Sequence, residues 1–241
     1  MPPVPPIDQS GLRNALLRRL PPDDFAHLVP HLEPVALLQG ETLAEPGQPF
    51  AHAVFPERGI VSIVSISLGG RMVESGLMGR EGFAPVGLAL DADRSPQRTL
   101  VQVPGQGHRV AAAALREVLM ARPALHRLLL RYSHALATQT ACTALSNAVH
   151  PVAERLARWL LMCHDRATGD EVALTHGTLG IMLAVRRPSV TTNLSTLEDA
   201  GFVRTRRGLI TVADRPGLEA FAGNAYGQPE AEYARLLGST E

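Results

Sequence analysis

The sequence contains no lysine, only two cysteines and no long hydrophobic run, although it has 241 residues. All 23 basic residues are arginines, and 23 acidic residues bring the net charge to zero. Cys142 and Cys163 cannot build a disulfide framework, and no CxxC or Cys/His spacing indicates zinc or an iron–sulfur cluster. The N-terminus lacks a basic segment followed by an apolar core, and no run of about 18 apolar residues occurs. We therefore expect a cytoplasmic protein that is neither exported nor membrane-spanning.

Residues 175–200 predict two short helices joined by a tight turn. The first begins at Thr175, a common N-cap residue, and the second near Arg187, because Pro188 suits the first turn of a helix. Each helix has one apolar stripe with the spacing of a buried face. This arrangement is a helix-turn-helix, which places its second helix in the major groove of DNA. Ala184 in the turn stands where many such turns have a glycine in a left-handed conformation.

The face of the second helix opposite its apolar stripe is polar and has no carboxylate before Glu198. Residues 202–212 then predict a small hairpin, or wing, with its turn at Arg206-Arg207-Gly208. Six arginines and three acidic residues give residues 175–215 a net charge of +3, which suits phosphate binding. The side chains that we expect to contact DNA here are Arg186, Arg187, Ser189, Thr191, Thr192, Ser195, Arg206 and Arg207. The alternative is a winged helix used only for protein contacts.

Residues 34–110 have the pattern of short β-strands. Apolar runs alternate with turn signals at residues 39–40, 56–59, 69–70, 79 and 104–105, which predicts an antiparallel jelly roll. Short helices are expected before it at residues 10–20 and 21–32, after a proline-rich segment that we expect to be frayed. His27 and His31 lie one helical turn apart, but no third ligand accompanies them, so we predict no metal site.

Residues 124–147 predict a long helix with a heptad stripe, which can pair with a second subunit. Further leucines widen the stripe enough for the helix to pack on the β domain as well. The predicted dimer interface comprises Leu125, Leu128, Tyr132, Leu136, Gln139 and Cys142.

These patterns predict an α+β chain with three parts. A β-roll sensor domain with N-terminal helices occupies residues 10–121, a dimerisation and linker helix residues 122–148, and a winged helix-turn-helix residues 149–222. Residues 223–241 form a tail with only weak helical potential.

Several segments resemble the Crp/Fnr superfamily of bacterial transcription regulators: VFPERGIVSIV, GLMGREGF, HPVAERLARWLL, LAVRRPSVTTNLSTLEDAGFV and RRGLITVADRPGLEAFA. The resemblance covers nearly the whole chain and is strongest over residues 150–222. It implies a homodimer on a pseudo-palindromic operator, with recognition helices roughly 34 Å apart in successive major grooves. RNA polymerase is a further expected partner.

On this resemblance, single residues of the helix-turn-helix take family roles. Arg187 matches the arginine that reads guanine, and Thr192 takes the place of a second reading arginine. Pro188 replaces a glutamate that accepts a hydrogen bond from cytosine, so the half-site is expected to differ from that of the cAMP receptor protein. The family positions that contact phosphate are matched by Thr175, His176 and Ser189.

The segment that binds cyclic AMP in some family members is altered. Val86, followed by Gly87, stands where the ribose-binding glutamate would be, and Arg98, followed by Thr99, lies near the phosphate position. Valine offers the 2′-hydroxyl no hydrogen bond, so cyclic AMP in the usual pose is not expected. The cysteine cluster of oxygen-sensing members and the haem ligands of haem-binding members are also missing. The sequence therefore names no effector or cofactor.

Two other classes of function fit parts of the sequence. A cupin-like jelly-roll metalloenzyme needs clustered metal ligands, yet residues 34–110 hold only His52 and His108, far apart and without an HxH pattern. A ligand-binding module acting on a protein partner would differ by having no affinity for DNA. No catalytic triad or carboxylate pair stands out, so we do not expect an enzyme.

Overall fold

The computed structural model describes residues 7–238, and most of the N-terminal segment expected to be frayed lies outside this range. Before the long helix α4, the elements are η1 (Gln9–Gly11), α1 (Ala15–Arg18), α2 (Pro22–Leu28), η2 (Val29–His31), β1 (Glu33–Leu37), β2 (Thr42–Ala44), β3 (His52–Ile66), β4 (Met72–Met78), η3 (Val86–Leu90), β5 (Arg98–Ala111) and α3 (Ala112–Ala121). From α4 onwards they are α4 (Pro123–Val149), α5 (Val152–His164), β6 (Glu171–Val172), α6 (His176–Met182), α7 (Arg187–Asp199), β7 (Val203–Arg206), β8 (Leu209–Val212), α8 (Arg215–Ala222), η4 (Gly223–Ala225) and α9 (Gln228–Leu237).

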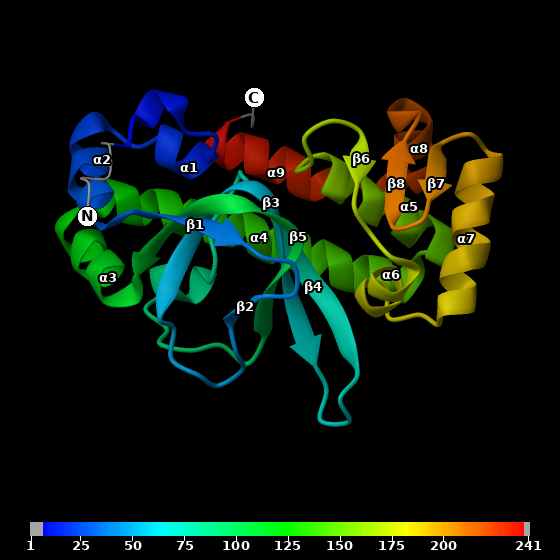
Figure 1. Ribbon diagram of the computed structural model, residues 1–241, viewed down its shortest axis with the longest axis horizontal. Helices are drawn as coiled ribbons and strands as arrows, with labels where there is room; N and C mark the ends of the chain where they lie inside the picture. Colours follow the sequence, from blue (N-terminus) through cyan, green and yellow to red (C-terminus); the bar gives the residue numbers. More distant parts are fainter. Residues whose placement is uncertain (1–6, 239–241) are drawn as a thin grey trace.

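The N-terminal domain is built on an antiparallel sheet with the strand order β1-β5-β3-β4, and β2 also pairs with β5. Helices α1 to α3 lie at one end of it, α4 runs along it, and the C-terminal domain lies at the other end (Figure 1). The predicted α+β fold with an antiparallel β domain is confirmed.

Two turns predicted inside this domain are wrong, because β3 runs through residues 56–59 and β5 through residues 104–105 with shifts in register. Gly59 and Gly105 allow strands β3 and β5 to approach each other closely. A Cβ atom at Gly59 would lie 2.7 Å from the carbonyl oxygen of Val103, and one at Gly105 would lie 2.1 Å from that of Arg58. Glycine is therefore needed here to let two backbones meet, a role that local sequence does not distinguish from a turn.

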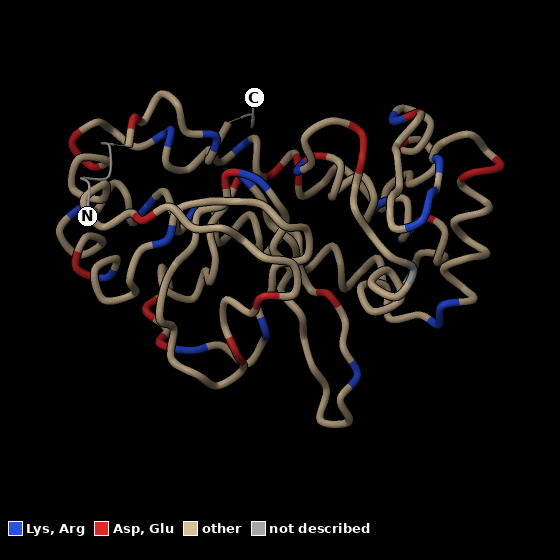
Figure 2. Tube along the Cα trace, in the orientation of Figure 1, with Lys and Arg blue, Asp and Glu red and all other residues tan. Residues whose placement is uncertain are grey.

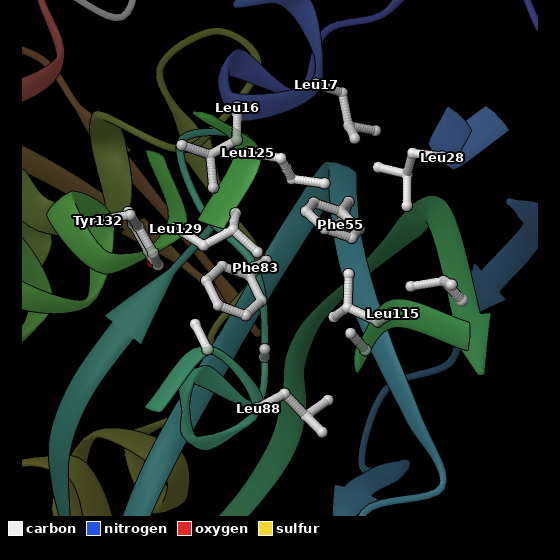
Figure 3. Close-up of a cluster of buried hydrophobic side chains, with 14 of the residues drawn as sticks. Leu16, Leu17, Leu28, Phe55, Phe83, Leu88, Leu115, Leu125, Leu129 and Tyr132 are labelled. Carbon is white, nitrogen blue, oxygen red and sulfur yellow. The ribbon is translucent and has the colours of Figure 1, made fainter. Parts of the chain in front are cut away.

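The first hydrophobic core fills the β domain and joins it to the N-terminal helices and α4. Phe55 and Phe83 stack at 5.6 Å between ring centroids, and Figure 3 shows them close to Leu125 and Leu129 of α4. Tyr132 packs against Phe83 at 5.7 Å, with its hydroxyl so near Gly82 that a Cβ there would lie 1.9 Å away. The interior of the roll is thus closely filled beside α4.

The heptad stripe predicted as a dimer seam belongs to this same core. Leu125, Tyr132, Leu136 and Gln139 are all at most 5% exposed within a single chain. Leu128 packs against the first core, and Cys142 donates a weak hydrogen bond to Gln228 of α9. Leu125, Tyr132, Leu136 and Gln139 are therefore covered within one chain in this conformation, whereas Leu128 and Cys142 stay partly exposed. The sequence showed an apolar stripe, but it could not show that the chain's own β domain and α9 cover it.

The tail forms helix α9, so the expectation of weak helical potential is wrong for residues 228–237. The helix packs along α4 and reaches the N-terminal helices (Figure 1). Tyr233 donates a hydrogen bond of 3.0 Å to the carbonyl oxygen of Glu81, and Leu237 is buried in the first core. Tertiary packing thus stabilises a segment whose local helical signals are weak. No helix in the described range is both long and apolar enough to cross a bilayer.

The second hydrophobic core crosses the boundary between the domains. It combines Ile60, Val64 and Leu77 of the sheet with the buried faces of α5, α6, α7 and the wing. Trp159 of α5 donates a hydrogen bond of 2.5 Å to Glu74 of β4 within it. Side-chain packing therefore continues between the β domain and the C-terminal domain.

Candidate nucleic-acid interface

Helices α6 and α7 form the predicted helix-turn-helix. The hydroxyl of Thr175 caps α6 by accepting from the amide of Thr178 at 3.1 Å. Ala184 has a φ of 53°, in the left-handed region, and the amide of Val185 closes the turn on the carbonyl of Gly180 at 2.9 Å. The turn therefore has the geometry of the motif without the usual glycine.

The apolar stripe of α7 anchors the helix and sets which face is outward. Val190, Leu194 and Leu197 are at most 2% exposed and lie in the second core. Figure 1 shows α7 at the end of the molecule away from the β domain, with the rest of the C-terminal domain between them. The polar face of the helix is consequently accessible from outside.

The structure places the predicted contact residues of α7 together on this face. Arg186, Arg187, Thr191, Thr192 and Ser195 are exposed, and Ser189 is half-buried. The hydroxyls of Thr191 and Thr192 donate to the carbonyl oxygens four residues earlier, at 3.2 and 3.1 Å. Because the proton of Thr192 is used within the helix, its hydroxyl oxygen can act only as an acceptor, which suits an amino group of a base.

The wing follows α7 and is tied to its end. Strands β7 and β8 pair as a hairpin, and Glu198 of α7 accepts from the backbone amide of Thr205 at 2.8 Å and from its hydroxyl at 3.0 Å. The carboxylate that could have repelled phosphate therefore holds the wing in place. Arg206 and Arg207 are exposed at the hairpin turn.

The charge of this surface is concentrated and uncompensated. Over residues 7–238, no ion pair involves the exposed arginines of the motif and wing, which are Arg186, Arg187, Arg204, Arg206 and Arg207. Figure 2 shows these basic segments at the start of α7 and in the β7–β8 hairpin. Arg215 belongs elsewhere, because it pairs with Asp165 at 2.7 Å and Glu219 at 2.8 Å. Free guanidinium groups on one surface suit a polyanion.

The remaining predicted contacts lie at the start of α6. Thr175 is exposed, but its hydroxyl is engaged in capping the helix. His176 is the first residue of α6, and the placement of its side chain falls outside what the structure describes.

Sequence reasoning missed two exposed residues of the same surface, Arg204 and Thr196. Arg204 lies between Val203, which is buried, and Thr205, so the alternation along a strand would have placed it outward. Thr196 follows Thr192 by one helical turn and donates to its carbonyl oxygen at 3.1 Å.

The positions expected for an effector differ in their burial and partners. Val86 is half-buried against the first core, and a Cβ atom at Gly87 would lie 2.9 Å from the ring of Phe50. Arg98 pairs with Glu45 at 3.1 Å near the surface, whereas Thr99 is 3% exposed. None of the four predicted residues lines the cavity described below.

Comparisons with known proteins agree with this geometry. Residues 154–221 match the family of Crp-like helix-turn-helix domains. No curated protein matches the chain.

Solved structures share the fold over most of the chain. FixK2 from Bradyrhizobium japonicum is 15% identical, with a TM-score of 0.68 over 80% of this chain and 98% of that chain. The c-di-GMP-responsive global regulator CLP of Xanthomonas campestris is 15% identical, with a TM-score of 0.63 over 79% and 98%. TTHB099, a CRP-family transcriptional regulator from Thermus thermophilus, is 20% identical, with a TM-score of 0.63 over 79% and 96%. Residues 154–221 thus match the Crp-like helix-turn-helix family, and the chain as a whole shares the fold of these solved structures.

Proposed function

We propose that this protein is a transcription regulator of the Crp/Fnr superfamily that binds DNA sequence-specifically as a homodimer, with α7 in the major groove and the β7–β8 wing on the backbone. The outward polar face of α7 carries the proposal, because its exposed arginines and hydroxyl side chains lie opposite a fully buried stripe. Arg187 would donate two hydrogen bonds to guanine, while the threonines and Ser195 would contact bases or phosphates. We take residues 10–121 as the sensor domain, 122–148 as the linker helix and 149–222 as the DNA-binding domain.

Selection from a random duplex library tests the proposal. The wild-type protein should enrich a pseudo-palindrome whose half-sites are centred about one helical turn apart. A triple variant with alanine at positions 191, 192 and 195 should lose that enrichment while folding normally, since all three side chains are exposed. Enrichment of the same sequence by the triple variant would contradict direct reading by α7, and no enrichment by wild type would contradict sequence-specific binding.

We further propose that the homodimer pairs through the face of α4 that remains exposed in the single chain. One side of α4 packs on the β domain and another on α9, which leaves a third side in solvent. Along that side a stripe recurs at intervals of three and four residues: Leu130, His134, Ala137, Ala141, Ala144 and Ala148. His134 lies at the border with α9, where it contacts Glu232 at 3.2 Å. This is the spacing of a two-stranded coiled coil, and small residues allow a close approach of two helices.

Light scattering across a concentration series tests which stripe pairs. Ala141→Glu places a charge at the centre of the exposed stripe and should shift the dimer toward monomer. Ala231→Glu, on an exposed position of α9, makes the same change away from α4 and should leave the dimer intact. A dimer unaffected by Ala141→Glu would rule out this face. Contact with RNA polymerase stays a prediction of the family resemblance, and cytoplasmic location stays a prediction of the sequence composition.

A further inference from the structure

A cavity of about 300 Å³ lies where α4, α9, the loop after β4 and the end of α5 meet. Its volume is at the lower end of the range of small-molecule sites, which is roughly 300–1,000 Å³. The chain has three tyrosines, and all of them, Tyr132, Tyr226 and Tyr233, line this one cavity. Leu136 and Pro229 add apolar surface. Such walls suit an organic molecule with an apolar or aromatic body.

Most charged groups around the cavity are already compensated. Arg166 and Glu81 form an ion pair of 2.7 Å in which both side chains are 9% exposed. Asp165 pairs with Arg215 at 2.7 Å and accepts from the hydroxyl of Tyr226 at 2.9 Å. These pairs leave no spare charge for a ligand.

Two lining groups of opposite sign form no direct ion pair within the described residues, although Arg166 and Arg158 lie close enough to Glu230 to favour its charged form. Glu230 accepts from the backbone amide of Gly227 with one oxygen, at 3.1 Å, and burial raises the pKa of its carboxyl group. Arg80 is half-buried in the loop after β4. Within residues 7–238, neither side chain forms an ion pair with any other. A charged side chain in a partly desolvated site is stabilised by an oppositely charged group, which a ligand can supply here.

We propose that this cavity binds a small zwitterion of the amino-acid class, with its ammonium group at Glu230, its carboxylate at Arg80 and its side chain among the three tyrosines. A cation alone would leave Arg80 without a partner, and an anion alone would leave Glu230 without one. The site lies outside the β-roll positions expected for a cyclic nucleotide and uses α9, which sequence reasoning took for a weakly structured tail.

The cavity wall joins both domains, so its occupant touches each of them. Arg80 belongs to the β domain, whereas the hydroxyl of Tyr226 is hydrogen-bonded to Asp165 and Arg215 of the C-terminal domain. A ligand that favours this arrangement of the domains changes DNA affinity if another arrangement binds DNA differently. That consequence rests on the proposed function, whereas binding of the zwitterion does not.

Thermal-shift and calorimetric titration of the full chain test the site without DNA. The twenty protein amino acids are screened at millimolar concentration, beginning with L-phenylalanine; at least one should raise the midpoint and saturate. For phenylalanine, phenethylamine and 3-phenylpropionate each lack one of the two charges, and each should bind at least tenfold more weakly. No saturable binding by any amino acid, or equal binding by an analogue that lacks one charge, would overturn the proposal.

Variants that remove one charge each assign the two charges. Glu230→Gln should weaken the amino acid at least tenfold but leave 3-phenylpropionate unchanged, and Arg80→Gln should weaken the amino acid but leave phenethylamine unchanged. Glu232→Gln, two residues along α9 and outside the cavity wall, is the matched control and should bind as wild type does. Equal affinity of Glu230→Gln and wild type for the amino acid would refute the assignment. Calorimetry detects binding even if DNA affinity never changes, so failure of this site and failure of DNA binding are separable.

Discussion

Replacing Glu74 with glutamine should make the free energy of unfolding fall by about 1–3 kcal/mol less between about pH 5 and 8. Glu74 lies on β4, is 4% exposed, and accepts hydrogen bonds from Ser62 at 2.6 Å and from Trp159 at 2.5 Å. Its burial in the core between the domains raises its pKa from 4.5 to about 7, against the opposing effect of these hydrogen bonds and of two arginines nearby.

The sign of the effect follows from where the proton is bound. Below the unfolded pKa of 4.5 the carboxyl group is protonated in both states, and its contribution to stability is fully present. As the pH rises through about 7, the folded protein must give up a proton that the unfolded chain has already lost, so that contribution disappears. The difference between the two pKa values corresponds to about 3 kcal/mol, an upper bound for a network that can relax. Glutamine is neutral throughout and keeps a carbonyl acceptor for Trp159.

Urea titrations at a series of pH values measure the effect. The wild-type free energy of unfolding should fall from pH 5 to pH 8 by about 1–3 kcal/mol more than that of the Glu74→Gln variant. Glu33→Gln removes an exposed carboxylate of the β domain and should follow the wild-type curve. Parallel curves for wild type and Glu74→Gln would show that burial does not raise the pKa of Glu74, and would refute this prediction.

Three further outcomes are expected from the described contacts. Ala184→Gly should raise the free energy of unfolding by about 1 kcal/mol in denaturant titrations, because it relieves the left-handed backbone of the turn, and a loss of stability would contradict that strain. Tyr132→Phe should raise it by a similar amount, about 1 kcal/mol, because the buried hydroxyl has no hydrogen-bond partner in the described range; calorimetric melting checks this, and a lower midpoint would point to a partner. Arg206→Gln should reduce the slope of log affinity against log salt by about one and leave the preferred DNA sequence unchanged, and an altered preference would argue against a phosphate contact.

The helix-turn-helix could be predicted because its determinants are local. Thr175 caps α6 and Pro188 lies in the first turn of α7, as the N-cap and proline preferences indicate. The stripe at Val190, Leu194 and Leu197 fixes which face is outward, and the turn at Gly208 fixes the wing. Each signal spans only a few residues, so the sequence alone carries it.

The features that could not be predicted depend on contacts between distant residues. Gly59 resembles a turn residue, yet its role depends on Val103, more than forty positions away. The stripe with Leu125 and Leu136 had the spacing of a dimer seam, but whether a second chain or the same chain covers it is decided by tertiary packing. The cavity beside α9 combines residues from opposite ends of the sequence, from Arg80 to Glu230, and no local pattern joins them.

The proposed recognition of DNA depends most on Arg187, which would contact a base from the exposed start of α7. The direct measurement is the ratio of affinities for the selected duplex and for a scrambled duplex of the same composition, compared between wild type and Arg187→Ala. The ratio should fall by about 5- to 150-fold, equivalent to about 1–3 kcal/mol, while Arg18→Ala, an exposed arginine of α1, should leave it unchanged. A ratio in Arg187→Ala equal to that of wild type would contradict recognition by this helix.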